Sequence, residues 1–106
     1  MTKTGGGSDM TTPNPTEKVI WKYEFVQGGD DLSASIPEGG MILTVQVQEL
    51  TGNPCIWVLC NPSNPQVCRR FKFYGTGMHL PADPGVYVGT YQILNGKFVA
   101  HMFEVE

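Results

Sequence analysis

The feature that most constrains the fold is an alternation of apolar and polar residues with a period of two, broken by turn-forming residues about every 8 to 12 positions. In residues 18–25, for example, Val19, Trp21 and Tyr23 fall on one side of an extended chain, whereas Lys22 and Glu24 fall on the other. No segment carries a helical apolar stripe over three turns. The pattern therefore predicts an all-β fold, an antiparallel β-sandwich or small barrel of about six or seven strands.

The turn signals set the limits of the expected strands, which are 18–25, 32–36, 41–49, 55–60, 67–74, 86–94 and 98–105. In residues 41–49 we expect Leu43, Val45 and Val47 to face inward. The segment 55–60 is almost entirely apolar and predicts a central strand covered on both faces. Asn95-Gly96 is the strongest hairpin signal and predicts that the last two strands pair as a ribbon.

Length and composition indicate one domain. Residues 1–16 are rich in glycine, proline and threonine, lack aromatic residues and predict a flexible tail, so that 17–106 form a single β domain. The net charge of −3 argues against non-specific binding to nucleic acid or to an anionic membrane. No apolar run is long enough to span a bilayer and no signal peptide is recognisable, so we expect a cytoplasmic protein.

The three cysteines, Cys55, Cys60 and Cys68, form an odd set with gaps that do not fit a zinc site. We expect free thiols and neither a metal nor a cofactor. The two tryptophans, Trp21 and Trp57, stand in apolar alternation and are expected in the core.

The richest candidate for a binding site is the stretch 69–91, which holds both arginines of the chain. Alternate positions of its first strand place Arg70, Lys72 and Tyr74 on one face, where they suit a phosphate and a stacked base. The glycines that follow allow backbone N–H groups to approach an anion. The alternative is a solvated strand face. The full candidate ligand-binding set is Arg69, Arg70, Lys72, Tyr74, Gly75, Thr76, Gly77 and His79.

Catalytic motifs are absent, which predicts a protein that is not an enzyme and has no catalytic residues. His79 stands alone in a loop and is more simply a solvated residue. His101 alternates with Val99, Phe103 and Val105 and is expected inside the fold, bonded to a strand neighbour.

Several of these segments together resemble a family of small phage and prophage proteins whose domain has no assigned function. The resemblance spans about residues 18–105, and its clearest signatures are 18–25, 69–77 and 84–91. It transfers no catalytic residue. It implies a viral setting, the cytoplasm of a host bacterium, in which short accessory proteins often act against host defence.

Three functions remain open. The first is inhibition of a host antiviral defence system by binding a host defence protein, which the acidic surface and the absence of catalytic motifs favour. The second is an oligomeric binder that sequesters a nucleotide-type immune signal or another anionic small molecule. The third is a virion or assembly accessory protein. A homodimer or higher oligomer is expected, because the apolar segments 19–25 and 98–105 would otherwise expose sheet edges.

Overall fold

The computed structural model describes residues 2–5, 17–26 and 31–106, with side chains from residue 17 onward apart from Asp31. The described chain is all β and contains no helix, hence none that is long and apolar enough to cross a membrane. Its strands are β1 (Thr2–Gly5), β2 (Val19–Glu24), β3 (Asp31–Pro37), β4 (Met41–Val47), β5 (Pro54–Cys60), β6 (Gln66–Gly75), β7 (Val86–Ile93) and β8 (Phe98–Val105).

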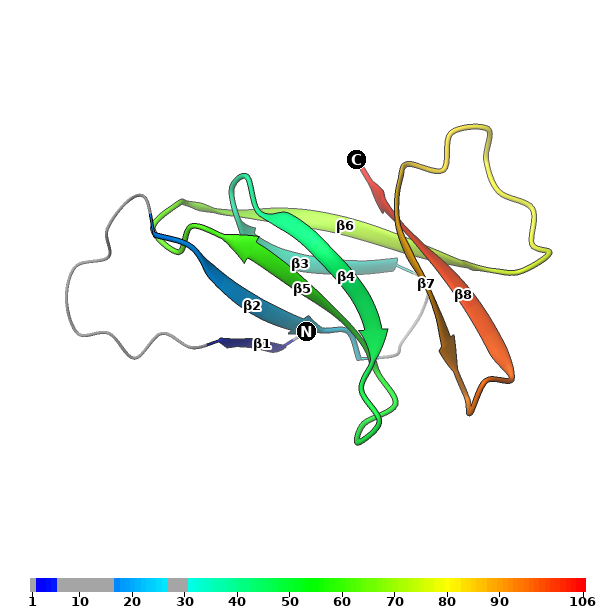
Figure 1. Ribbon diagram of the computed structural model, residues 1–106. Helices are drawn as coiled ribbons and strands as arrows, with labels where there is room; N and C mark the ends of the chain where they lie inside the picture. The colour runs from blue at the N-terminus through cyan, green and yellow to red at the C-terminus, as the bar shows by residue number, and fades with distance from the viewer. Residues whose placement is uncertain (1, 6–16, 27–30) are drawn as a thin grey trace.

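Two antiparallel sheets make up the fold (Figure 1). Sheet A has the strand order β1-β2-β5-β4, and sheet B has the order β3-β6-β8-β7. Strands β2 to β8 are the seven strands of the domain and confirm the predicted all-β sandwich-like fold. Strand β1 falls within the predicted flexible tail, yet its four residues pair with β2, from Thr2 opposite Glu24 to Gly5 opposite Trp21. The rest of that tail lies outside the described residues.

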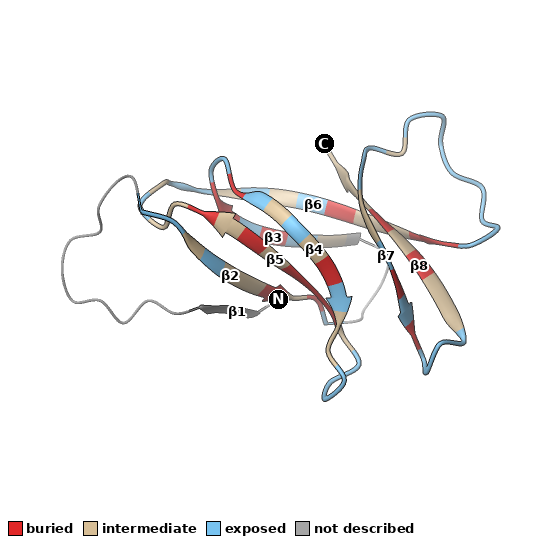
Figure 2. Cartoon of the chain, in the orientation of Figure 1, coloured by how far each residue is buried: buried red, intermediate tan, exposed pale blue. Residues whose placement is uncertain are grey.

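The core lies between the two sheets, and strands β2 to β8 all contribute buried apolar side chains to it. Figure 2 marks the buried positions along these strands. Its largest fully buried side chains include Tyr23 of β2, Ile56 of β5, Phe71 of β6 and Met102 of β8. The rings of Phe25 and Phe71 meet across the sandwich at a centroid distance of 5.6 Å. Burial of these side chains, each worth about 1.5 to 3 kcal/mol, holds the sheets together.

The turns confirm most of the expected boundaries. The β3–β4 turn closes through a 3.0 Å hydrogen bond from Gly40 N–H to the Pro37 carbonyl. Strands β7 and β8 pair as the predicted ribbon, with Asn95 and Gly96 both at positive φ. The connection between the predicted strands 18–25 and 32–36 lies largely outside the described residues.

Strand β4 corrects one predicted orientation. A β-bulge between Ile42 and Thr44 inserts an extra residue, so that Ile42 and Val45 both face the core. The prediction that Leu43 faces inward is therefore wrong, and its side chain is exposed on the outer face. A bulge shifts every residue before it to the opposite face from the one that strict alternation assigns.

Strand β5 corrects a second prediction, which concerns the covering of its two faces. It lies between β2 and β4 in sheet A and is therefore a central strand, as predicted. Within the described part of the chain, however, no second layer covers its outer face. Trp57 lies on that face, half-buried, beside the exposed Ile20 and Leu43. The prediction that Trp57 is a core residue is wrong, whereas Trp21 does pack against the core.

Candidate functional site

A cleft of about 600 Å³ lies on the outer face of sheet B, beneath the long loop that joins β6 to β7. Arg70, Lys72 and Tyr74 form its floor, as alternate residues of β6. Pro81, Asp83 and Pro84 of the loop line it from the other side. The three floor residues that alternation placed on one face are thus brought together in one hollow.

The loop is positioned by close backbone contacts at its two ends. At its start, Thr76 N–H donates to the Val99 carbonyl at 3.2 Å and Met78 N–H donates to the Gly75 carbonyl at 3.1 Å. At its end, Gly85 has a φ of +105°, and a Cβ there would lie 2.2 Å from the Glu104 carbonyl oxygen. Only glycine allows this approach, which returns the chain from the loop to β7.

Two cations, Arg70 and Lys72, line the cleft together with two acidic residues, Asp83 and Glu106, in a protein of net charge −3. Arg70 is exposed, and its Nη2 donates to the backbone carbonyl of Glu106. Lys72 is half-buried. The carboxylate of Asp83 accepts the Gly85 N–H at 3.1 Å, so that it also serves to shape the loop. Arg70 and Lys72 are the groups that can bind an anion here.

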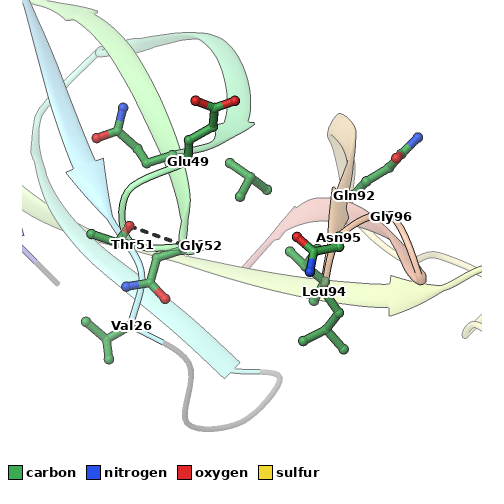
Figure 3. A pocket seen from close by; sticks show the side chains of 12 residues that line it. Val26, Glu49, Thr51, Gly52, Gln92, Leu94, Asn95 and Gly96 are labelled. Atoms are coloured by element: carbon green, nitrogen blue, oxygen red, sulfur yellow. Dashed lines mark hydrogen bonds between the residues drawn. The ribbon is translucent and has the colours of Figure 1, made fainter.

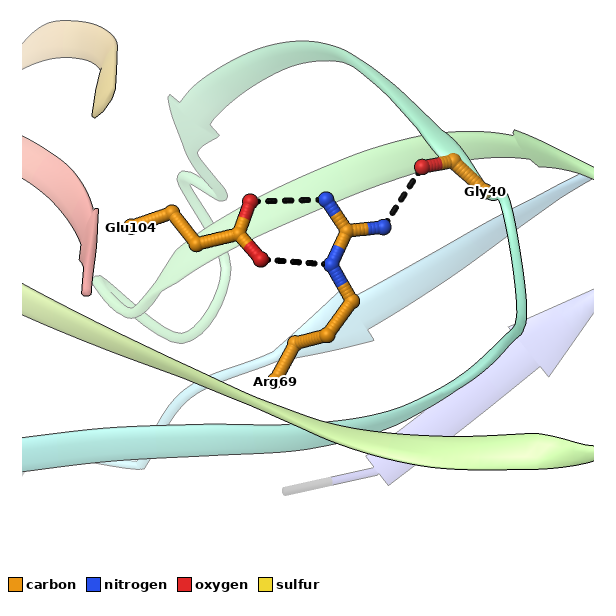
Figure 4. Close-up of polar contacts among 3 residues, drawn as sticks. All are labelled: Gly40, Arg69 and Glu104. Atoms are coloured by element: carbon orange, nitrogen blue, oxygen red, sulfur yellow. Dashed lines mark hydrogen bonds and ion pairs between the residues drawn. The ribbon is translucent and has the colours of Figure 1, made fainter. Parts of the chain in front are cut away.

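Arg69 does not reach this cleft, although it was among the predicted ligand-binding residues. It lies on the opposite face of β6, where its Nε and Nη2 bond both carboxylate oxygens of Glu104 at 2.6 and 2.7 Å (Figure 4). Its Nη1 donates to the Gly40 carbonyl at 2.5 Å. The hydrogen bonds with Glu104 raise the pKa of Arg69 above its usual value. All three nitrogens of its guanidinium are committed to structure, so Arg69 is a clamp and not a ligand residue.

Tyr74 lines the cleft but cannot offer an open ring face, because only 9% of its surface is exposed. Its ring meets that of Phe103 edge-on, with the centroids 6.0 Å apart. The expectation that Tyr74 stacks a base therefore does not fit its burial.

The glycine-rich segment also differs from the expected anion nest. Gly75 N–H points to the sulfur of Met78 at 3.1 Å, and the N–H groups of Thr76 and Met78 already have carbonyl acceptors. Gly77, at a φ of +89°, turns the chain. His79 is exposed and does not line the cleft. These residues build the loop, so that Arg70 and Lys72 are the candidate residues that remain for binding an anion in the cleft.

A chain of hydrogen-bonded side chains lies next to the cleft on the same outer face. His101 Nε2 bonds Thr76 Oγ1 at 2.8 Å, and His101 Nδ1 bonds Thr90 Oγ1 at 2.9 Å. Thr90 Oγ1 in turn lies 2.5 Å from the hydroxyl of Tyr87. The prediction that His101 faces the core is wrong, because Ala100 and Met102 are the buried residues of this stretch. It does bond strand neighbours, as expected.

Sequence reasoning missed Tyr87, Thr90 and Phe103 as parts of this face. A bulge between Tyr87 and Gly89 puts Tyr87 and Thr90, three positions apart, on the same side of β7. Strict alternation places them on opposite faces, and no turn signal marks the extra residue. Bulges are frequent next to binding sites, where they redirect a side chain.

A second hollow, of about 690 Å³, lies between the 48–53 turn and the 94–97 turn (Figure 3). Its one charged lining residue is Glu49, and it has neither a cation nor a histidine. Val26, on its rim, adjoins residues outside the described part of the chain. Size alone does not make it the better candidate, so we base no function on it.

Among the described residues, no group of three or more His, Cys, Asp or Glu side chains is placed to hold a metal ion. The three cysteines, all among the described residues, form no disulfide. Cys55 and Cys60 are buried, and burial raises the pKa of the Cys55 thiol. A raised pKa lowers the thiolate fraction, which makes Cys55 a poor metal ligand or nucleophile.

Comparison with known proteins places the chain in one family. Residues 16–106 match the family described as "Domain of unknown function (DUF7352)", and the chain belongs to it. No curated protein and no solved structure matches the chain. The expectation of a domain without an assigned function is confirmed, and the family description carries no statement about phages.

Proposed function

We propose that this member of a family without an assigned activity is a binding protein, not an enzyme, and that it takes a small phosphate-bearing anion in the cleft of sheet B. The observation that carries the proposal is the placement of Arg70 and Lys72 on the floor of one cleft beneath a shaped loop. The setting that fits it is sequestration of an anionic signal in the cytoplasm of a phage-infected bacterium.

The cleft suits a small ligand better than it suits the flat surface of a partner protein. Its volume lies in the range of small-molecule sites, and two cations converge on it from one strand. Arginine forms charge-assisted, bidentate contacts with phosphate, each worth about 1.5 to 3 kcal/mol. The Asp83 carboxylate selects against a second anion close to the loop, and so favours a ligand with a single phosphate group near Arg70.

Calorimetric titration tests the proposal with a panel of inorganic phosphate, sugar phosphates and linear and cyclic nucleotides. We expect at least one phosphate ligand to bind, and the variant Arg70→Ala to weaken it by about 10- to 150-fold. Lys97→Ala is the matched control, because it removes an exposed cation from the β7–β8 turn, away from the cleft. A panel without binding heat, or equal losses in the two variants, would contradict the proposal.

A second candidate function is inhibition of a host defence protein through a protein interface. The observation in its favour is an apolar strip on the outer face of sheet A, formed by Ile20, Leu43 and Trp57. Clustered exposed apolar side chains often mark a protein partner surface. A second copy of the chain is the other occupant that fits this strip. The homodimer was predicted because the apolar segments 19–25 and 98–105 would expose sheet edges. That basis does not hold, because β2 and β8 each have a neighbouring strand on both sides. The apolar strip takes its place as the basis for a homodimer.

Light scattering of the wild-type chain and of Leu43→Lys separates these occupants of the strip. A dimer that dissociates in the variant identifies the second copy. A monomer that binds a purified defence protein, with binding lost in Leu43→Lys, supports the inhibitor. A monomer whose partner binding is unchanged in the variant would exclude the strip from both roles.

A further inference from the structure

We propose that the ring of Tyr87 is a stacking surface for a flat aromatic group, so that the ligand of the cleft is a nucleotide. This inference rests on the proposed function, since it assigns the second half of the same ligand. It moves the stacking role from Tyr74, which is covered, to a tyrosine that alternation did not place on this face.

Tyr87 is exposed and yet held at both ends of its ring. Its exposed fraction is 57%, the largest of any aromatic residue among the described side chains. The ring meets Phe103 at a centroid distance of 5.6 Å and an interplanar angle of 64°. Its hydroxyl is fixed by the Thr90–His101–Thr76 chain of hydrogen bonds. The ring is therefore packed against Phe103 and bonded at its hydroxyl, while more than half of the surface of Tyr87 remains open.

Holding an exposed side chain in place costs conformational entropy and gains little from burial. The same order is an advantage in a binding site, because a preorganised aromatic ring loses less freedom when a ligand stacks on it. The hydroxyl chain thus acts on binding through Tyr87, and Thr90 and His101 are positioning residues for that ring.

The register places Tyr87 at a suitable distance from the cations. Lys72 on β6 and Tyr87 on β7 both lie directly opposite Phe103 on β8. They are two strand spacings apart, about 10 Å between Cα atoms. A phosphate at Arg70 and Lys72 and a base at Tyr87 leave the sugar to lie over Phe103. A nucleotide has this order of groups, whereas inorganic phosphate or a sugar phosphate reaches only one end.

The test compares adenosine monophosphate with ribose phosphate by calorimetry on the full chain, at one ionic strength. We expect the nucleotide to bind about 5- to 150-fold more tightly, the range for one base stacked on an aromatic side chain. Tyr87→Leu should remove that advantage and leave the ribose phosphate affinity unchanged. Leu50→Ala, at a fully exposed site in the β4–β5 turn, should change neither affinity.

Two conservative variants test the positioning chain. Tyr87→Phe keeps the ring but loses its hydrogen bond, and Thr90→Val removes the bond from the other side. Both should lower the preference for the nucleotide by the same factor, smaller than that of Tyr87→Leu. Unequal losses, or a loss that also affects ribose phosphate, would overturn the positioning role.

The outcomes separate this inference from the proposal on which it rests. If ribose phosphate binds and the nucleotide binds no more tightly, the stacking role of Tyr87 fails and the anion cleft remains. If neither binds and inorganic phosphate also fails, the anion cleft itself is wrong. If Tyr87→Leu weakens both ligands equally, Tyr87 supports the fold of the site and does not stack a base.

Discussion

Tyr23 lies at the centre of the core, fully buried, with a hydroxyl that has no hydrogen-bond partner among the described residues. A buried hydroxyl without a partner costs about 1 to 3 kcal/mol of desolvation free energy. The ring itself contributes to the core, so the alternation that predicted Tyr23 as inward was correct about the side chain as a whole. The hydroxyl is the part that the fold does not satisfy.

Replacing Tyr23 with Phe should therefore stabilise the protein. We expect the free energy of unfolding in urea to rise by about 1 kcal/mol, because the variant removes the unpaired hydroxyl and keeps the ring. Tyr91→Phe is the control, since the Tyr91 hydroxyl is not a buried unpaired group. An equal rise in both variants, or a fall for Tyr23→Phe, would show that the Tyr23 hydroxyl has a partner in solution.

The same two tyrosines predict how stability depends on alkaline pH. Burial raises the pKa of both Tyr23 and Tyr91 to about 12, and the nearby Cys60 adds to the effect at Tyr23. The folded state therefore keeps its proton where the unfolded chain, near pH 10, loses it. The free energy of unfolding should be level below pH 10 and fall between pH 10 and 12.

Each tyrosine accounts for about 2 to 3 kcal/mol of that loss. Urea titrations at intervals from pH 9 to 12 measure the slope, which should be shallower in Tyr23→Phe and in Tyr91→Phe. A slope that neither variant changes would assign the alkaline loss to other groups.

At the scale of single elements, the β7–β8 turn carries a strained residue. Leu94 has a φ of +54° and precedes Asn95 and Gly96, which also have positive φ. Asparagine and glycine tolerate this conformation, whereas for leucine it is unfavourable by about 1 kcal/mol or more. Its side chain is exposed, so no contact with the core offsets the strain.

Leu94→Asn should raise the free energy of unfolding by about 0.5 to 1 kcal/mol, because asparagine enters the left-handed region more easily. Leu50→Asn serves as the control, since Leu50 is an exposed turn residue that does not itself have a positive φ. Thermal and urea unfolding measure both. A gain in the control of the same size would mean that lower surface hydrophobicity, not backbone strain, is the cause.

The loop over the cleft depends on Gly85, and the contrast with Gly77 makes this testable. Both have positive φ, but a Cβ at Gly85 meets the Glu104 backbone, whereas a Cβ at Gly77 meets nothing within 4 Å. Gly85→Ala should lower the free energy of unfolding by about 3 kcal/mol, the combined cost of overpacking and strain. Gly77→Ala should cost about 1 kcal/mol, from φ alone. Similar losses in the two variants would contradict the close approach.

The strands of this chain could be predicted from sequence, but the faces of β4, β7 and β8 could not. In β8 both faces carry large apolar residues, so alternation did not decide between them and placed His101 inside. Alternation and turn residues located the domain's strands and the Asn95-Gly96 ribbon. The bulges at Leu43 in β4 and Val88 in β7 each add one residue that no turn signal announces. Because the side-chain period is two, one extra residue reverses the assigned face. That is why Arg70, Lys72 and Tyr74 were grouped correctly, whereas Tyr87 and Thr90 were missed.

At the scale of the whole molecule, Arg69 connects parts that are far apart in the chain. It stands on β6, bonds Glu104 on the neighbouring β8, and donates to the Gly40 carbonyl at the turn where the chain passes from sheet B into sheet A. Sequence could not reveal this role, because Arg69 and Arg70 are adjacent and identical in type. Only the sheet pairing decides that one faces the margin of the core and the other faces the cleft.

The adjacent arginines therefore form a matched pair for the last prediction. Arg69→Ala should lower the free energy of unfolding by about 2 to 3 kcal/mol, because it leaves Glu104 and the Gly40 carbonyl without their half-buried partner. Arg70→Ala, which loses an exposed contact, should change it by no more than about 0.5 kcal/mol. A double-mutant cycle of Arg69→Ala with Glu104→Ala should give a coupling of at least about 1 kcal/mol, since two parallel hydrogen bonds join the pair.

The binding assay should reverse the order of the two arginine variants. Arg70→Ala should lose the phosphate ligand, and Arg69→Ala should retain it at temperatures where it stays folded. Equal effects of the two variants on stability would refute the clamp. A loss of ligand in Arg69→Ala alone would place the anion on the other face of β6.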